Sequence, residues 1–158
     1  MSADSFDGFD YKPDRRVADA ETRRRYWATA IGLQAVDGLE VSPYLHELAR
    51  AYEAGRYSLE QTGQLVRAYH ENADSSETRE ADLVSQRIVE MLDRGSFAFT
   101  PDMLSAIHQQ LFQDLEEATY RPGQFKTDRL VKQEDILNGD SVLYADPGMI
   151  QLSLDYLF

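Results

Sequence analysis

Histidine is the side chain best suited to acid–base and metal chemistry near neutral pH, and this chain has three, His46, His70 and His108. His46 precedes Glu47, but a zinc-protease helix needs a second histidine four residues after the first, and that position is Arg50. His108 lies beside an apolar helix face, where a histidine is usually a packed core residue. The chain has no cysteine, which excludes thiolate zinc sites and disulfides. We therefore expect no catalytic or metal-binding set of residues in this sequence.

Sequence motifs for phosphate binding are also missing. There is no GxxxxGK[ST] loop, and no glycine-rich dinucleotide turn follows an expected strand. The formal net charge is -12 at pH 7, so nucleic acid is repelled unless one face is locally basic. The basic cluster of residues 23–25 lies beside Glu21 on an expected helix, and we interpret it as a solvated face. No nucleic-acid partner is expected.

The length and the hydropathy pattern favour a cytoplasmic protein. The 158 residues suffice for one domain with a real core, or for one domain with a small appendage. No apolar run approaches the roughly 20 residues that span a bilayer. The first ten residues are acidic where a signal peptide is basic, so we expect no membrane partner. Residues 1–13 have no periodic apolar face and are expected to form a disordered tail.

The first expected helix begins at Pro13-Asp14. Trp27, Ile31 and Ala35 follow one another at spacings of four and predict its buried stripe. Gly32 lies inside this helix, where glycine costs about 1 kcal/mol relative to alanine. We therefore expect another group to lie close to the backbone there.

Capping signals place the remaining helices. Ser42-Pro43 begins a second helix, and Ser58 with Gln61 forms a capping box for a third, so residues 14–73 are expected to fold as a small bundle. Polar residues after position 73 suggest a boundary between two subdomains. Further helices are expected over residues 77–93, from Thr100-Pro101 and from Asp146-Pro147.

Residues 124–145 break the helical pattern. Val131, Ile136 and Leu137, followed by residues 142–144, favour strands, and Asn138-Gly139 between them is a hairpin turn signal. We predict an all-α fold with one β-hairpin. An isolated hairpin is marginal in water, so it either packs on helices or covers something that it binds. The alternative is a structural surface loop.

The last expected helix reaches Phe158 without a glycine or a basic last turn. Its apolar residues Leu154, Leu157 and Phe158 need a neighbour to cover them. We interpret this as a domain that continues further or as a docking face for a partner.

Residues 97–144 resemble the first half of a Fic domain. In that pattern a Phe-x-Phe-Thr-Pro start leads through a helix with Ile-His and Leu-Phe to a Gly-x-Phe turn and a hairpin. Lys126 departs from the arginine that is usual in the family. The residues at the matching places are Phe97, Phe99, Thr100, Pro101, Leu104, Ile107, His108, Leu111, Phe112, Gly123, Phe125 and Thr127.

Residues 14–73 resemble the VbhA-like antitoxin module, which is sometimes fused ahead of a Fic domain. The inhibitory helix of that family carries Ser/Thr-x-x-x-Glu-Gly/Asn. Asp37 and Gly38 stand at the acidic and small positions, so the resemblance implies that they are inhibitory. Leu33 stands at the serine position and cannot donate a hydrogen bond, and aspartate is one methylene shorter than glutamate. The alternative is an ordinary acid before a helix-terminating glycine.

The Fic resemblance implies an activity and its cofactors. Fic enzymes typically transfer the AMP of ATP to a hydroxyl of a target protein, with Mg²⁺ neutralising the phosphates. Their hairpin is a flap that clamps the target protein as an added strand. Lys132 is the candidate for contacting phosphate, and a solvated strand lysine is the alternative. By position, the flap residues are Thr127, Leu130, Val131, Lys132 and Gln133.

The Fic catalytic signature is absent from residues 74–158, which resemble only the N-terminal part of the domain. That signature is a histidine, proline and phenylalanine followed by glycine-asparagine and arginine, and it supplies the general base and the phosphate contacts. We therefore expect the N-terminal portion of a self-inhibited AMP transferase, inactive alone and partnered by the missing C-terminal half. One alternative is a non-catalytic regulator that binds a Fic toxin as an antitoxin does. Another is an unrelated helical interaction module.

Overall fold

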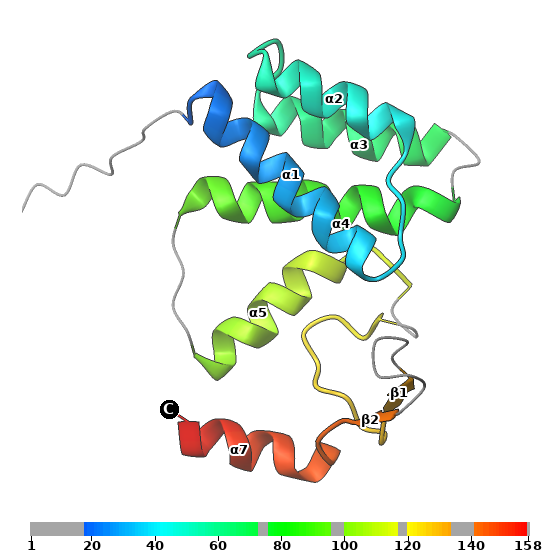
Figure 1. The fold of residues 1–158 in the computed structure, drawn as a ribbon, viewed down its shortest axis with the longest axis vertical. Coiled ribbons are helices and arrows are strands. Elements are labelled where there is room, and N and C mark those ends of the chain that lie inside the picture. The colour runs from blue at the N-terminus through cyan, green and yellow to red at the C-terminus, as the bar shows by residue number, and fades with distance from the viewer. Residues whose placement is uncertain (1–17, 73–75, 96–99, 117–119, 134–140, 158) are drawn as a thin grey trace, which may run out of the picture.

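The computed structural model describes residues 18–72, 76–95, 100–116, 120–133 and 141–157, and Figure 1 shows their arrangement. Helices account for most of this part of the chain, which confirms the predicted all-α character. The helices are α1 (Ala20–Val36), α2 (Pro43–Glu53), α3 (Leu59–Asn72), α4 (Ser76–Arg94), α5 (Pro101–Phe112) and α7 (Ile150–Leu157), with a 3-10 turn, η2 (Pro147–Met149). The predicted tail over residues 1–13 lies outside the described residues.

Helix α4 is the centre of the bundle. Residues 81–89 are all buried, as expected of a helix covered on every side, and α1, α2 and α3 pack with α4 into one core (Figure 1). Trp27 on α1 is 1% exposed and meets the ring of Tyr52 on α2 edge to face, with centroids 6.5 Å apart. The core thus contains residues from both sides of the boundary predicted near residue 74.

The start and the buried stripe of α1 differ from the sequence prediction. The helix begins at Ala20, after the carboxylate of Asp19 accepts a hydrogen bond of 2.7 Å from the Thr22 N–H. This bond from Thr22 lowers the pKa of Asp19. Trp27 is buried as predicted, but Ile31 is only half-buried and Ala35 is exposed. Ala30 and Gln34 are buried instead, because α1 meets α4 along a line through these residues.

The expectation of a close neighbour at Gly32 is also wrong. A Cβ at Gly32 would meet nothing within 4 Å, and the residue is exposed. Gly32→Ala is therefore expected to raise the free energy of unfolding by about 1 kcal/mol, which corresponds to a melting temperature about 2–4 °C higher. Gly38→Ala is the matched control, because Gly38 has a φ of +72° and alanine is strained there. Stabilisation by both variants, or by neither, would contradict this account.

Other capping predictions are confirmed. Ser58 and Gln61 bond reciprocally, with Ser58 N–H to Gln61 Oε1 at 2.8 Å and Gln61 N–H to Ser58 Oγ at 3.1 Å. Thr100 Oγ1 accepts the Met103 N–H at 3.1 Å. The carboxylate of Asp146 accepts the Gly148 N–H at 3.0 Å, but it caps the 3-10 turn η2, and the α-helix predicted from Asp146-Pro147 begins only at Ile150. Local side-chain chemistry therefore set these helix starts.

Two short strands, β1 (Val131–Gln133) and β2 (Ser141–Leu143), pair antiparallel, with Val131 opposite Leu143. Residues 124–130 have no regular structure, so a hairpin extending over residues 124–145 is not seen. The predicted Asn138-Gly139 turn lies outside the described residues. Val131 and Leu143 are 60% and 72% exposed, so side-chain burial on a helical core does not stabilise this pair.

Helix α7 lies apart from the bundle (Figure 1). It follows η2 directly and contains no buried residue, and Leu152, Tyr156 and Leu157 are 60%, 91% and 69% exposed. In the part of the chain that the structure describes, no helix combines the length and the apolar character needed to cross a bilayer.

Candidate functional site

A groove of about 520 Å³ lies between the end of α1, the middle of α4 and the end of α5. Leu33, Val36 and Asp37 of α1 line it together with Leu111 and Phe112 of α5. The structure thus brings the predicted inhibitory acid next to the Leu-Phe pair of the Fic-like pattern. We call this the α1–α5 groove, and its remaining lining residues are Gln34, Leu39, Glu80, Val84 and Ile88.

Gly38 has a complete structural explanation as the end of α1. With φ +72° it allows the Gly38 N–H to donate to Ala35 O at 3.1 Å and the Leu39 N–H to Gln34 O at 3.0 Å. These two bonds form a Schellman motif, which satisfies the last helix carbonyls. The backbone conformation at position 38 therefore favours glycine, independently of any inhibitory role.

Asp37 has no such explanation. It is the exposed C-cap of α1, and among the described residues its carboxylate has no hydrogen-bond or ion-pair partner. A negative charge at a helix C-terminus is disfavoured by the helix dipole, typically by about 0.3–1 kcal/mol. The carboxylate of Asp37 is therefore exposed to solvent at the edge of the α1–α5 groove.

His108 and Gly123, two residues of the Fic-like pattern, bond to each other. The Gly123 N–H donates to His108 Nδ1 at 2.9 Å, so in the neutral ring the proton lies on Nε2. Gly123 has φ +76°, and a Cβ there would come within 2.7 Å of Gln109 Oε1. The His108 ring packs on Phe112, with centroids 4.8 Å apart. These contacts agree with the interpretation of His108 as a packed residue.

Tyr120 connects the segment after α5 to helix α4 through a hydrogen bond and to α5 through a ring contact. Its hydroxyl donates to the carboxylate of Glu80, a groove residue, at 2.5 Å, and its ring stacks on Phe112 with centroids 5.4 Å apart. The bond to Glu80, helped by burial, raises the pKa of Tyr120 to about 12. Tyr120 was not singled out from the sequence, because its partner is 40 residues away.

This raised pKa predicts a pH dependence. Because the folded-state pKa of Tyr120 lies above its ordinary value of 10.0, the phenol stabilises the fold fully below about pH 10 and loses this contribution as pH rises towards 12. Tyr120→Phe should remove both this alkaline dependence of stability and one late phenolate step in an absorbance titration. An unchanged titration curve in Tyr120→Phe would contradict the assignment.

Among the described side chains, those of the predicted flap residues Thr127, Leu130 and Val131 do not line the α1–α5 groove. Thr127 Oγ1 accepts a bond of 2.6 Å from Arg121 Nη1 and is exposed, as are Leu130 and Val131. Lys132 pairs through its backbone with β2, and so does Gln133, but the side chains of both lie outside the described part. No phosphate contact by Lys132 is therefore established.

Lys126, which departs from the Fic pattern, has a defined place. Its Nζ lies 5.2 Å from the centroid of the Tyr144 ring. This cation–π contact joins the two sides of the strand pair. The ammonium is buried and has no hydrogen-bond partner among the described atoms.

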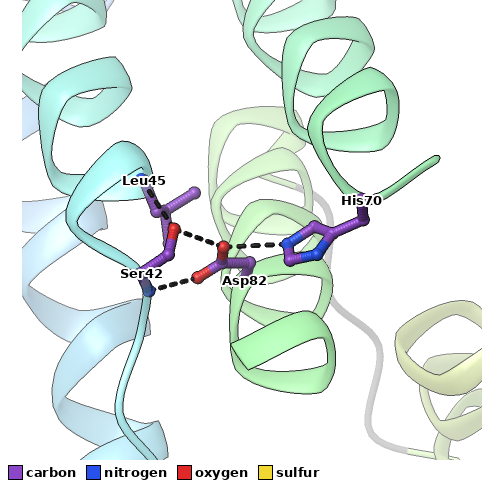
Figure 2. Close-up of polar contacts among 4 residues, drawn as sticks. All are labelled: Ser42, Leu45, His70 and Asp82. Atoms are coloured by element: carbon purple, nitrogen blue, oxygen red, sulfur yellow. Dashed lines mark hydrogen bonds and ion pairs between the residues drawn. The ribbon is translucent and has the colours of Figure 1, made fainter. Parts of the chain in front are cut away.

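Sequence reasoning missed a buried polar cluster formed by Ser42, His70 and Asp82, shown in Figure 2. The Ser42 N–H donates to Asp82 Oδ1 at 2.8 Å, the Ser42 hydroxyl donates to Oδ2 at 2.6 Å, and His70 Nε2 lies 2.9 Å from Oδ2. Ser42 Oγ also accepts the Leu45 N–H at 3.0 Å, so the same side chain caps α2. No sequence signal marks Asp82, because it is one of many polar residues of α4.

The Ser42–His70–Asp82 cluster has the residue types of a hydrolase triad but not its geometry. In a triad the histidine lies between the serine and the acid and takes the hydroxyl proton. Here Asp82 lies in the middle, and the serine hydroxyl donates to the carboxylate. Ser42 and Asp82 are each 1% exposed, so no substrate reaches them. The cluster joins α2, α3 and α4 and is structural.

Among the described residues no group of three or more histidines, cysteines or acids could hold a metal ion. In nucleotide sites Mg²⁺ is usually held by only one or two carboxylates together with the phosphates.

No protein-family model, curated protein or solved structure matches the chain.

Proposed function

We propose that this chain is the N-terminal portion of a self-inhibited Fic-type protein AMP transferase and has no transferase activity by itself. The proposal rests on the sequence resemblance over residues 97–144 and on the absence of the Fic signature from the chain. ATP and Mg²⁺ would bind together with a C-terminal half that supplies the signature.

The α1–α5 groove is the structural feature that best supports self-inhibition. Asp37 at the expected inhibitory position and Leu111 and Phe112 of the Fic-like helix line one groove, although more than 70 residues separate them in sequence. A self-inhibited enzyme needs its inhibitory helix beside the catalytic domain. The packing of α1 on α4, and of α4 on α5, supports that arrangement.

The unpartnered carboxylate of Asp37 suggests how inhibition would work. A carboxylate that pairs with the arginine for the ATP γ-phosphate excludes that phosphate and misorients the α-phosphate. That arginine would belong to the missing signature, which agrees with the lack of a partner for Asp37 among the described residues.

Two measurements test the transferase proposal. The reading frame downstream of the Phe158 codon should encode the histidine-to-arginine signature. The purified chain incubated with labelled ATP, Mg²⁺ and cell lysate should incorporate no label into protein, whereas the chain extended by that frame should do so. Labelling by the chain alone, or a downstream frame without the signature, would overturn the proposal.

Asp37→Ala in the extended protein is expected to increase labelling severalfold, because the inhibitory charge is removed. Glu40→Ala is the matched control, since Glu40 is an exposed acid three residues further along and should leave labelling unchanged. Equal labelling by Asp37→Ala and the unmodified protein would show that Asp37 caps α1 without inhibiting.

The flap belongs to the same proposal. Within the described residues β1 pairs only with β2, so its other edge is available to an added strand from a target protein. Leu130 and Val131 are 48% and 60% exposed and would contact that strand.

A second candidate is a non-catalytic partner of a separately encoded Fic toxin. The apolar residues Leu152, Tyr156 and Leu157 on α7 are mostly exposed and favour a covering protein. In this case the downstream frame lacks the signature, and adding the chain to the purified toxin abolishes AMP transfer. Leu152→Asp should then restore transfer by weakening the complex.

A further inference from the structure

Three arginines line a small pocket between α3, α4 and the turn after α5. Arg67 comes from α3, and Arg79 and Arg87 come from α4. The pocket measures about 140 Å³, and Glu71 and Asp114 also line it. This volume is well below the roughly 300–1,000 Å³ of sites for drug-sized ligands, so the pocket suits a small ion rather than a nucleotide.

Arg87 is the buried member of this arginine pocket. Its side chain is 8% exposed, Nη1 donates to Leu111 O at 2.7 Å, and Nη2 lies 3.3 Å from the Asp114 carboxylate. Burial lowers the pKa of Arg87, the negative charges of Asp114 and Glu90 oppose this shift, and the positive charges of Arg67 and Arg79 add a smaller lowering. The three guanidinium groups therefore line one pocket, where Asp114 and Glu90 offset part of their positive charge.

The other two arginines lack a paired carboxylate in the described part of the chain. Arg79 Nη2 donates to the neutral backbone oxygen of Asp114 at 3.0 Å, and Arg67 is exposed with no bonding partner there. Of the nearby acids, Asp114 already pairs with Arg87 and is 75% exposed, and Glu71 is exposed to solvent. The three arginines thus outnumber the two acids that line the pocket, on a protein whose net charge is -12.

We infer that the arginine pocket binds a small phosphate-type oxyanion, free or as a monoester. The planar donors of guanidinium groups match the oxygens of phosphate, and a doubly charged anion would relieve their mutual repulsion. Because α3, α4 and the turn after α5 all contribute, the bound ion would stabilise the docking of α5 on the bundle. This site is separate from the proposed AMP transfer and does not depend on it.

Thermal unfolding of the whole chain tests the inference. Sodium phosphate, sodium sulfate and sodium chloride are compared at equal ionic strength, and phosphoserine tests whether a monoester also binds. At ten times the dissociation constant, phosphate shifts the folded-to-unfolded ratio roughly tenfold, or about 1.4 kcal/mol. The melting temperature should then rise about 3–6 °C relative to chloride.

Arg67→Gln should abolish this phosphate-specific shift without unfolding the chain, because Arg67 is exposed and bonds to no described group. Arg24→Gln is the matched control, since Arg24 is an exposed arginine on α1 away from the pocket and should keep the shift. Equal shifts in phosphate and chloride would overturn the inference. Loss of the phosphate-specific shift in both Arg67→Gln and Arg24→Gln, or in neither, would also overturn it.

Discussion

Asp82→Ala is expected to lower the free energy of unfolding by about 3–5 kcal/mol. The carboxylate is 1% exposed and accepts bonds from the Ser42 N–H and hydroxyl while lying 2.9 Å from His70 Nε2. Removing it leaves these donors buried without their acceptor, and each such orphaned group costs about 1–3 kcal/mol. The substitution should weaken the packing of three helices, because Ser42 caps α2, His70 lies on α3 and Asp82 lies on α4.

Urea denaturation followed by circular dichroism measures this effect. Asp93→Ala is the matched control, an exposed aspartate on the same helix, and should change stability by no more than about 0.5 kcal/mol. Ser42→Ala should cost less than Asp82→Ala, because it removes the cap and one donor but keeps the contact between His70 and Asp82. If Asp82→Ala and Asp93→Ala are equally stable, the Ser42–His70–Asp82 cluster does not hold the bundle together.

Arg87→Ala is expected to cost about 2–4 kcal/mol and to loosen α5 from the bundle. The bond from the buried guanidinium to Leu111 O is charge-assisted, and such bonds contribute about 1.5–3 kcal/mol. The pair with Asp114 adds at most about 1 kcal/mol, because that carboxylate is 75% exposed. Loss of the packed side-chain stem adds to the effect.

Arg94→Ala is an internal control for the Arg87 variant. Arg94 lies two turns further along α4 and also contacts α5, through a 3.4 Å bond to Gln110 Oε1, but it is exposed. Its replacement should cost no more than about 0.5 kcal/mol. Hydrogen exchange should show faster exchange of the α5 amides in Arg87→Ala and not in Arg94→Ala. Unchanged α5 exchange in Arg87→Ala would contradict the anchoring role.

Local chemistry predicted much of the helical framework. Caps at Ser42, Ser58 and Thr100 were recognisable because each side chain bonds to a backbone N–H only three residues away. The prediction failed at α1, where Asp19 rather than Pro13-Asp14 caps the helix and a stripe through Ala30 rather than Ala35 is buried. Residues three or four apart lie on the same face of a helix, so the sequence alone allows either stripe. The packing of α1 on α4 decides which of the two is buried.

The candidate sites also combine features that the sequence shows with features that only the packing of the helices decides. The acid at position 37 and the Fic-like pattern could be recognised in the sequence, but their meeting in one groove depends on how α1 and α5 both pack on α4. The Ser42–His70–Asp82 cluster and the arginine pocket were not recognisable, because their members are distant in sequence and each alone is an ordinary polar residue. By itself the sequence determined which segments become helices and where several begin, since caps and apolar periodicity act over a few residues. Only the tertiary structure decided which polar groups are buried together, because burial and pairing depend on contacts between distant segments.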